Sequence, residues 1–276
     1  MINAQTYAKQ AEGIFTISDS FVKIRELSQD NNAELEDIAQ VVTLDPALAA
    51  AVLKLANSAF FNFPAKVDTV SKAVSLLGVT EIYNLAIAYF ISGALKASEG
   101  NHAYLKQFWT DSVDCALLVR FLAKQMQIKN PERLYIMGLL HNIGELVVQQ
   151  LDPATFEECA SSDIEHLPWQ QQKDTMGFTY ADITTELLQY WKLPLSISNP
   201  TQQQNKEDIK GNYPEARLLY LAKRVMLHNN YFQDQSINQL LSKEFLSAVN
   251  ITQDTIDNAN EYCTQERLSM MSLLSI

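Results

Sequence analysis

The chain has 276 residues, of which 47% are hydrophobic and 19% charged, and it contains only eight glycines and eight prolines. So few turn residues exclude sandwiches, barrels and propellers, which need a turn after every strand or two, and they also exclude collagen-like chains. The net charge of −11 at pH 7 opposes binding to nucleic-acid backbones and to anionic membranes. The composition therefore favours a soluble helical protein whose partners are proteins or cationic molecules.

Short amphipathic segments follow one another over the first 97 residues. Apolar residues at spacings of three and four predict helices over residues 18–30, 33–42, 47–58, 68–78 and 80–95. Asp45-Pro46 is a typical helix start, since Asp45 can cap free N–H groups and proline tolerates the first helical position. These segments predict an N-terminal helical lobe over residues 14–97.

A polar break at residues 97–101 separates this lobe from a second one, which we place at residues 101–276. The second lobe is predicted to contain helices over residues 102–126, 132–151, 163–176, 179–193, 214–228, 236–249 and 252–274. Asn130-Pro131 is expected to cap and start the second of these helices. Residues 195–214 are rich in Ser, Asn, Pro and Gln, which indicates a long exposed connection. No segment shows sustained alternation and no repeat has a fixed period, so the predicted fold class is all-α.

The segment 132–151 has two unlike faces if it is one helix. One face is apolar, whereas Gly138, His141, Asn142 and Glu145 fall on the other. Glycine in a helix interior costs about 1 kcal/mol relative to alanine, so Gly138 and Gly144 indicate that another element approaches closely. His141 and Asn142 would then line an internal seam. His141 is either a buried histidine satisfied by its neighbours or part of a binding site.

The three cysteines, Cys115, Cys159 and Cys263, lie far apart and form no CxxC or CxxH pair. This indicates reduced thiols rather than a disulfide framework or a zinc site. The N-terminus lacks a basic start followed by an apolar core, and apolar stretches are interrupted well before about 18 residues. We therefore expect a cytoplasmic protein with no leader and no membrane span.

Six motifs occur in an order that resembles the HDOD family, bacterial signalling domains related to HD-type phosphohydrolases. Gly138–Gly144 resembles the GLLHDIG core of HD hydrolases. The other five resemble HDOD signatures and are Leu44–Leu48, Leu55–Ala59, Ala73–Gly78, Phe108–Ser112 and Glu186–Pro194. The resemblance covers roughly residues 14–204. It implies a multi-helix fold in which an N-terminal helical lobe packs on an HD-like lobe, together forming a single HDOD-like module over residues 14–276.

The same resemblance marks a pocket in which the expected metal ligands are replaced. The first histidine of an HD site is Asp111 here, the His-Asp doublet is His141-Asn142, and a later histidine position holds Tyr180. Asparagine lacks the negative charge that favours a hard divalent cation. The histidine pair expected after the last motif is also missing from residues 196–202. The resemblance therefore implies a vestigial pocket of Asp111, His141, Asn142 and Tyr180, with no catalytic residue, metal or cofactor.

Two functional interpretations of different classes follow. The first is a non-catalytic signalling or scaffold module that contacts signalling proteins in trans or binds a small ligand in the degenerate pocket. The alternative is a divergent metal-dependent phosphohydrolase in which Asp111, His141 and Asp182 form a reduced site. Regulation through nucleic acid is a third, weaker interpretation, because the acidic charge opposes it. No other catalytic motif and no output module is recognisable in the chain, and its oligomeric state cannot be predicted.

Overall fold

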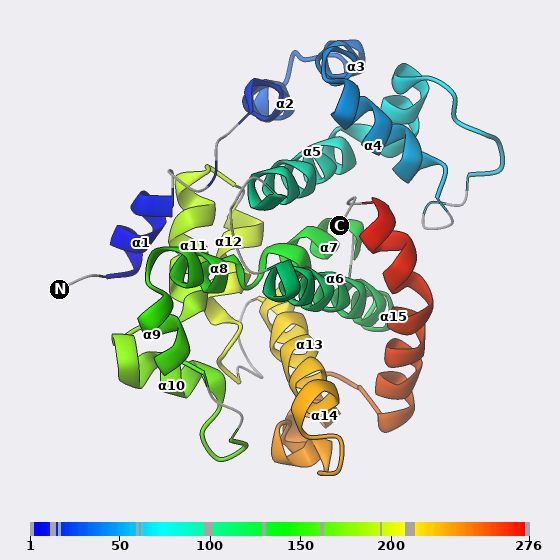
Figure 1. The fold of residues 1–276 in the computed structure, drawn as a ribbon. Helices are drawn as coiled ribbons and strands as arrows, with labels where there is room; N and C mark the ends of the chain where they lie inside the picture. Colours follow the sequence, from blue (N-terminus) through cyan, green and yellow to red (C-terminus); the bar gives the residue numbers. More distant parts are fainter. Residues whose placement is uncertain are drawn as a thin grey trace. The chain divides into compact units, whose positions relative to one another are not determined.

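A computed structural model describes residues 3–11, 15, 18–58, 61, 63–96, 102–128, 131–160, 163–193, 195–207 and 213–273 (Figure 1). Every regular element within these residues is a helix, which confirms the predicted all-α class. The chain divides into a larger unit, Met1–Ile14 with His102–Gln265, and a smaller unit, Phe15–Asn101 with Glu266–Ile276. The polar break at residues 97–101 and the Asn130 cap lie outside the described residues.

The smaller unit is built from α2 (Asp19–Gln29), α3 (Leu35–Leu44), α4 (Pro46–Ala56) and α5 (Val70–Lys96). The predicted cap at Asp45 is confirmed, because its Oδ1 accepts a hydrogen bond from the Leu48 amide at 3.0 Å. The helices α2, α3 and α4 all pack against α5. Phe21 stacks on Phe90 at a centroid distance of 5.2 Å and fixes α2 on the core of this unit.

Gly78 interrupts α5, as the sequence indicates. Its φ of +80° suits glycine, which has no Cβ to clash there, and it divides α5 into two helical stretches. Among the described residues, Val70–Phe90 is long and apolar enough to cross a membrane, and 61% of its apolar window is buried in the structure. The bent pair formed by α3 and α4 also passes that test when the two helices are taken together. Buried core helices have the same length and composition, so these segments are weak evidence for a membrane span.

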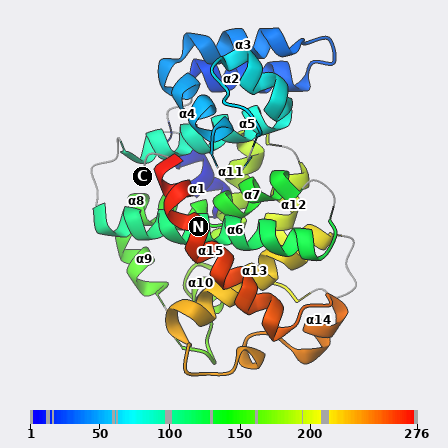
Figure 2. The same cartoon turned by 90° about the vertical axis from the view of Figure 1, so that its right-hand side faces the viewer.

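The larger unit contains most of the helices. They are α1 (Ala4–Gln10), α6 (His102–Gln125), α7 (Pro131–Leu140), α8 (Ile143–Leu151), α9 (Pro153–Glu158), α10 (Pro168–Met176), α11 (Tyr180–Tyr190), α12 (Leu195–Gln203), α13 (Pro214–Tyr231), the 3₁₀ helix η2 (Ile237–Gln239), α14 (Lys243–Ala248) and most of α15 (Gln253–Leu273). The long helix α6 packs on α7 and α13, and α11 packs on α1, α8 and α12. Figure 2 shows α15 crossing α6, where the guanidinium of Arg120 donates to the Tyr262 hydroxyl at 2.8 Å.

Three predictions about the larger unit are wrong. The segment 132–151 is two helices, α7 and α8, separated by a turn at His141-Asn142. Residues 195–203, predicted as part of an exposed connection, form α12, in which Ser198 and Thr201 are fully buried. The segment 236–249 is the short η2 followed by α14. In addition, α1 and α9 were not predicted from the sequence.

Candidate functional site

Two glycines bring two pairs of helices in the larger unit into close contact. A Cβ atom at Gly138 would lie 2.6 Å from the Ala116 Cα on α6. A Cβ atom at Gly144 would lie 2.2 Å from the Tyr180 carbonyl oxygen on α11. Only glycine permits such distances, so the close approach predicted from these two residues is confirmed. The contacts fix α7 on α6 and α8 on α11.

The turn between α7 and α8 is fixed by hydrogen bonds from both sides. The Nδ1–H of His141 donates to the Gly138 carbonyl at 2.7 Å. The side chain of Gln204, just after α12, donates to the His141 carbonyl at 2.8 Å. On the other side of the turn, the Gly144 amide donates to the Thr184 hydroxyl at 2.9 Å. The turn is therefore held by α7, α11 and the end of α12.

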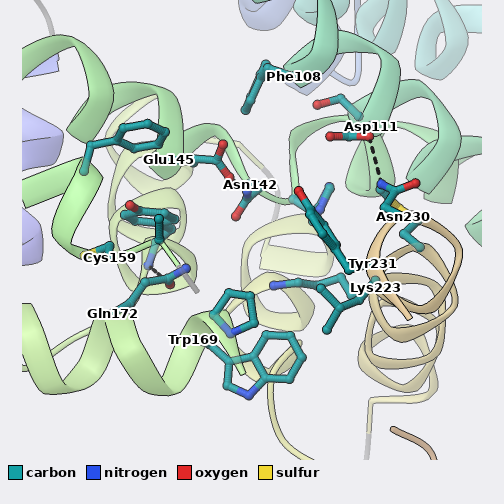
Figure 3. A pocket seen from close by; sticks show the side chains of 18 residues that line it. Phe108, Asp111, Asn142, Glu145, Cys159, Trp169, Gln172, Lys223, Asn230 and Tyr231 are labelled. Carbon is teal, nitrogen blue, oxygen red and sulfur yellow. Dashed lines mark hydrogen bonds between the residues drawn. The ribbon is translucent and has the colours of Figure 1, made fainter. Parts of the chain in front are cut away.

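Next to this turn lies a pocket of about 440 Å³ (Figure 3). All four residues that the sequence assigns to a vestigial pocket, Asp111, His141, Asn142 and Tyr180, line it. The apolar and aromatic lining residues are Phe108, Phe156, Ala160, Pro168, Trp169, Met226, Leu227 and Tyr231. The other polar lining residues are Ser112, Glu145, Cys159, Gln172, Lys223 and Asn230. A cavity of this size with a few convergent polar groups is typical of a small-molecule site.

Glu145, on the first turn of α8, is a hydrogen-bonded carboxylate of the pocket. The Tyr104 hydroxyl donates to its Oε1 at 3.0 Å, and the Asn142 side-chain amide donates to its Oε2. Burial and the nearby Asp111 raise the pKa of Glu145 to about 7, although the two hydrogen bonds and Lys223 favour its ionised form. Glu145 is therefore a mixture of charged and neutral forms at neutral pH. The sequence placed it on the same helical face as His141 but did not assign it to the pocket.

Lys223, on α13, is another lining residue that the sequence did not assign to the pocket. Its Nζ donates to the Asn205 side-chain oxygen at 2.8 Å and lies 5.3 Å from the centre of the Trp169 ring. Burial and the adjacent Arg224 lower the pKa of Lys223 to about 7. The only sequence signal was a Lys-Arg pair inside an apolar helical run, which does not show which of the two faces a cavity.

His141 is neutral in this environment. Burial and the positive charge of Lys223 lower its pKa to about 3, while the hydrogen bond to the Gly138 carbonyl acts in the opposite direction. Because Nδ1 carries the proton in that hydrogen bond, Nε2 carries the lone pair. Asp111 accepts hydrogen bonds from Gln107 at 3.0 Å and from Asn230 at 3.3 Å.

The residues present do not fit the metal centre of an HD hydrolase. Within the part of the chain that the structure describes, no group of three or more His, Cys, Asp or Glu side chains is placed to hold a metal ion. The amide nitrogen of Asn142 points at Glu145, and Asn142 supplies no carboxylate. Asp182, proposed from sequence as the third ligand of a reduced site, caps α11 instead. Its Oδ2 accepts from the Thr179 amide and hydroxyl, both at 2.8 Å.

Comparison with known proteins places the chain in a family. The profile of the HDOD domain matches residues 14–207. An uncharacterized protein from Treponema pallidum (strain Nichols) is 27% identical over 202 residues, which are 71% of this chain but only 38% of that relative. The chain thus spans well under half of the length of this relative.

Solved structures share the fold. A candidate signal transduction protein from Marinobacter aquaeolei VT8 aligns with 97% of this chain over 61% of its own length, with a TM-score of 0.72 and 23% identity. A candidate phosphohydrolase from Shewanella amazonensis SB2B aligns with 97% of this chain over 98% of its own length, with a TM-score of 0.72 and 24% identity. An HDOD domain protein of unknown function from Geobacter sulfurreducens covers 98% of both chains with a TM-score of 0.70 and 16% identity. These similarities and the profile match confirm the resemblance seen in the six motifs, and the chain belongs to the HDOD domain family.

Proposed function

We propose that this chain is a non-catalytic signalling module of the bacterial cytoplasm. In this proposal its pocket binds a small ligand, and the bound state is transmitted to signalling proteins through contacts in trans. The module holds no metal and performs no hydrolysis.

The composition of the pocket is the observation that supports this proposal. The glycine contacts hold α7 on α6 and α8 on α11, so the turn that carries His141 and Asn142 is positioned beside the cavity. The residues at the metal-binding positions are Asp111, Asn142 and Tyr180, and they leave His141 as an isolated neutral imidazole. A site with a shaped cavity and too few ligands for a hard cation is better suited to an organic molecule.

A ligand in this pocket would contact helices that do not follow one another in sequence. Lys223 belongs to α13, Glu145 to α8 and Asp111 to α6. A molecule that contacts all three stabilises whichever arrangement of these helices binds it best, and that differential affinity is the physical basis of a signal.

The deciding experiment measures metal content and hydrolysis in the same purified full-length sample. We expect manganese, iron and magnesium well below one equivalent, and no hydrolysis of phosphomonoesters or phosphodiesters above background. Stoichiometric metal together with turnover that disappears in His141→Ala would overturn the proposal in favour of a divergent phosphohydrolase. His166→Ala is the matched control, because His166 pairs with Asp174 at 3.2 Å and does not line the pocket.

A further inference from the structure

The pocket contains two side chains of opposite charge, Lys223 and Glu145, and the hydrogen bonds described for each go to neutral groups. The Lys223 ammonium donates to the neutral amide oxygen of Asn205. The Glu145 carboxylate accepts from two neutral donors, Tyr104 and Asn142. Lys223 and Glu145 attract each other across the cavity, and each favours the charged form of the other. Figure 3 shows both side chains directed into the cavity from different walls.

The acidic end of the cavity is reinforced by a second carboxylate. Asp111, on α6, lies near enough to Glu145 to oppose its ionisation. At the opposite end Arg224 stands beside Lys223 and opposes the charge on that lysine. A cation bound between Asp111 and Glu145 would relieve the first repulsion, and an anion bound at Lys223 would relieve the second. A ligand with both charges relieves both.

Aromatic side chains form part of the cavity wall. Phe108, Phe156 and Trp169 contribute ring surface to the cavity. Phe156 packs edge-on against Tyr104 at a centroid distance of 5.4 Å, which fixes one of these rings beside the Glu145 end. Such a lining favours an apolar or aromatic body in the ligand, and a cavity of about 440 Å³ is large enough for an amino acid with a large side chain.

We infer that the pocket binds a small zwitterion of the amino-acid class, with its ammonium group at Glu145 and Asp111, its carboxylate at the Lys223 ammonium, and an apolar or aromatic side chain against the rings. This inference names the ligand class of the proposed signalling function and rests on it. A simple anion would be attracted by one lysine but repelled by two carboxylates. A simple cation would leave the repulsion between Lys223 and Arg224 in place.

Isothermal titration calorimetry on the full chain tests the inference with three probes that share a phenyl ring and differ in charge. These are L-phenylalanine, phenethylamine and 3-phenylpropionate, with L-leucine, L-methionine, L-tyrosine and L-tryptophan added to cover other side chains. The tightest amino acid should bind at least tenfold more tightly than either singly charged probe. Equal or tighter binding of a singly charged probe, or no binding of any of these amino acids, overturns the inference.

Variants at the two ends of the cavity should show which end binds the ammonium group of the ligand and which binds its carboxylate. Glu145→Gln should weaken L-phenylalanine and phenethylamine at least tenfold and leave 3-phenylpropionate unchanged or slightly tighter. Lys223→Met should weaken L-phenylalanine and 3-phenylpropionate and spare phenethylamine. The control is Lys173→Met, an exposed lysine on α10 that does not line the pocket. Unchanged affinity in both pocket variants contradicts the inference.

Proton exchange on binding gives a readout in the unmodified protein. With a pKa of about 7, Glu145 is mostly protonated at pH 6 and should release a proton when the ammonium binds. Lys223, also with a pKa of about 7, is mostly neutral at pH 8 and should take up a proton when the carboxylate binds. Titrations in buffers of different ionisation enthalpy should therefore show net release at pH 6 and net uptake at pH 8. The same sign at both pH values contradicts the inference.

Several other titratable groups in and near the pocket stay neutral between pH 6 and pH 8. Burial raises the pKa of the Tyr104, Tyr180, Cys115 and Cys159 side chains, which keeps them neutral in this range, and Tyr231 is shifted in the same direction. His141 is neutral because its pKa is about 3. If the protein is metal-free and inactive but binds no amino acid, the inference of a zwitterionic ligand is wrong and the proposed signalling function still stands. Stoichiometric metal with turnover would overturn the signalling function itself.

Discussion

At the scale of single residues, Glu145 links the stability of the protein to pH. Its pKa rises from an ordinary value of 4.5 to about 7 in the folded protein, mainly because of burial. A carboxyl group with a raised pKa contributes stability that is fully present below pH 4.5 and is lost as the pH rises through 7. The hydrogen bonds from Tyr104 and Asn142 limit this loss, since they stabilise the ionised form.

Glu145→Gln should remove this pH dependence. Between pH 4.5 and pH 8 the wild-type protein should lose roughly 3 kcal/mol of its free energy of unfolding relative to the variant, because only the wild type has a carboxylate to ionise. Urea unfolding at a series of pH values measures the difference. Glu157→Gln, at an exposed position on α9, is the control. A constant difference between wild type and Glu145→Gln over this range would contradict the assigned environment of Glu145.

His141 should stay neutral across the physiological range. Its pKa of about 3 lies below the ordinary 6.5, so it contributes stability that is present above pH 6.5 and is lost as the pH falls towards 3. In side-chain ¹⁵N NMR spectra, one of the four histidines should show the Nδ1–H tautomer without change from pH 5 to pH 8. His141→Gln assigns that signal by removing it. A protonated His141 signal above pH 5 would refute the assignment.

At the scale of the secondary-structure elements, the turn between α7 and α8 shows why a periodic pattern is not sufficient. The apolar spacing of residues 132–151 fits one continuous helix, yet the helix ends at Leu140 and starts again at Ile143. The Gln204 side chain donates to the His141 carbonyl and the Thr184 hydroxyl accepts from the Gly144 amide, so two residues distant in sequence hold the interrupted backbone. Helical periodicity predicts which residues are buried. It does not predict which distant residues form hydrogen bonds with the backbone where the helix is interrupted.

Gly138→Ala and Gly144→Ala should each reduce stability by about 1–3 kcal/mol, because the added methyl group meets backbone atoms that cannot move aside cheaply. The nearest atoms are the Ala116 Cα at 2.6 Å and the Tyr180 carbonyl oxygen at 2.2 Å. Gly93→Ala in α5 is the control, since a Cβ there meets nothing within 4 Å and alanine should stabilise the helix by about 0.5–1 kcal/mol. Thermal or urea unfolding of the three variants provides the test, and Gly138→Ala as stable as wild type would contradict the close contact.

The helix α12 was missed for a related reason. Its sequence is rich in Ser, Asn, Pro and Gln, which indicates an exposed connection in an isolated chain. In the protein Thr201 is fully buried, and its hydroxyl donates to the Ile197 carbonyl one turn earlier at 2.9 Å. Packing against α11 and α13 outweighs the weak helix propensity of these residues.

At the scale of the whole molecule, the net charge of −11 argues against nucleic-acid partners. We expect no retention of fluorescently labelled duplex DNA by the full chain at ~10 µM protein and ~150 mM salt, because the protein would repel the phosphate backbone. Fluorescence anisotropy measures this binding, with a basic DNA-binding protein as the positive control. Micromolar binding that weakens steeply as the salt concentration rises would reveal a local basic surface and would contradict the expectation.

The sequence by itself determined the all-α class, the start of α4, the break at Gly78, the tight contacts at Gly138 and Gly144, and membership of the HDOD family. These features depend on local propensity, on glycine geometry and on short motifs, which are properties of neighbouring residues. It also predicted that Asp111, His141, Asn142 and Tyr180 share one pocket, and all four line the cavity. Only the tertiary structure decided that Glu145 and Lys223 face each other across that cavity, because α8 and α13 are far apart in sequence and no local pattern records which of their faces meet.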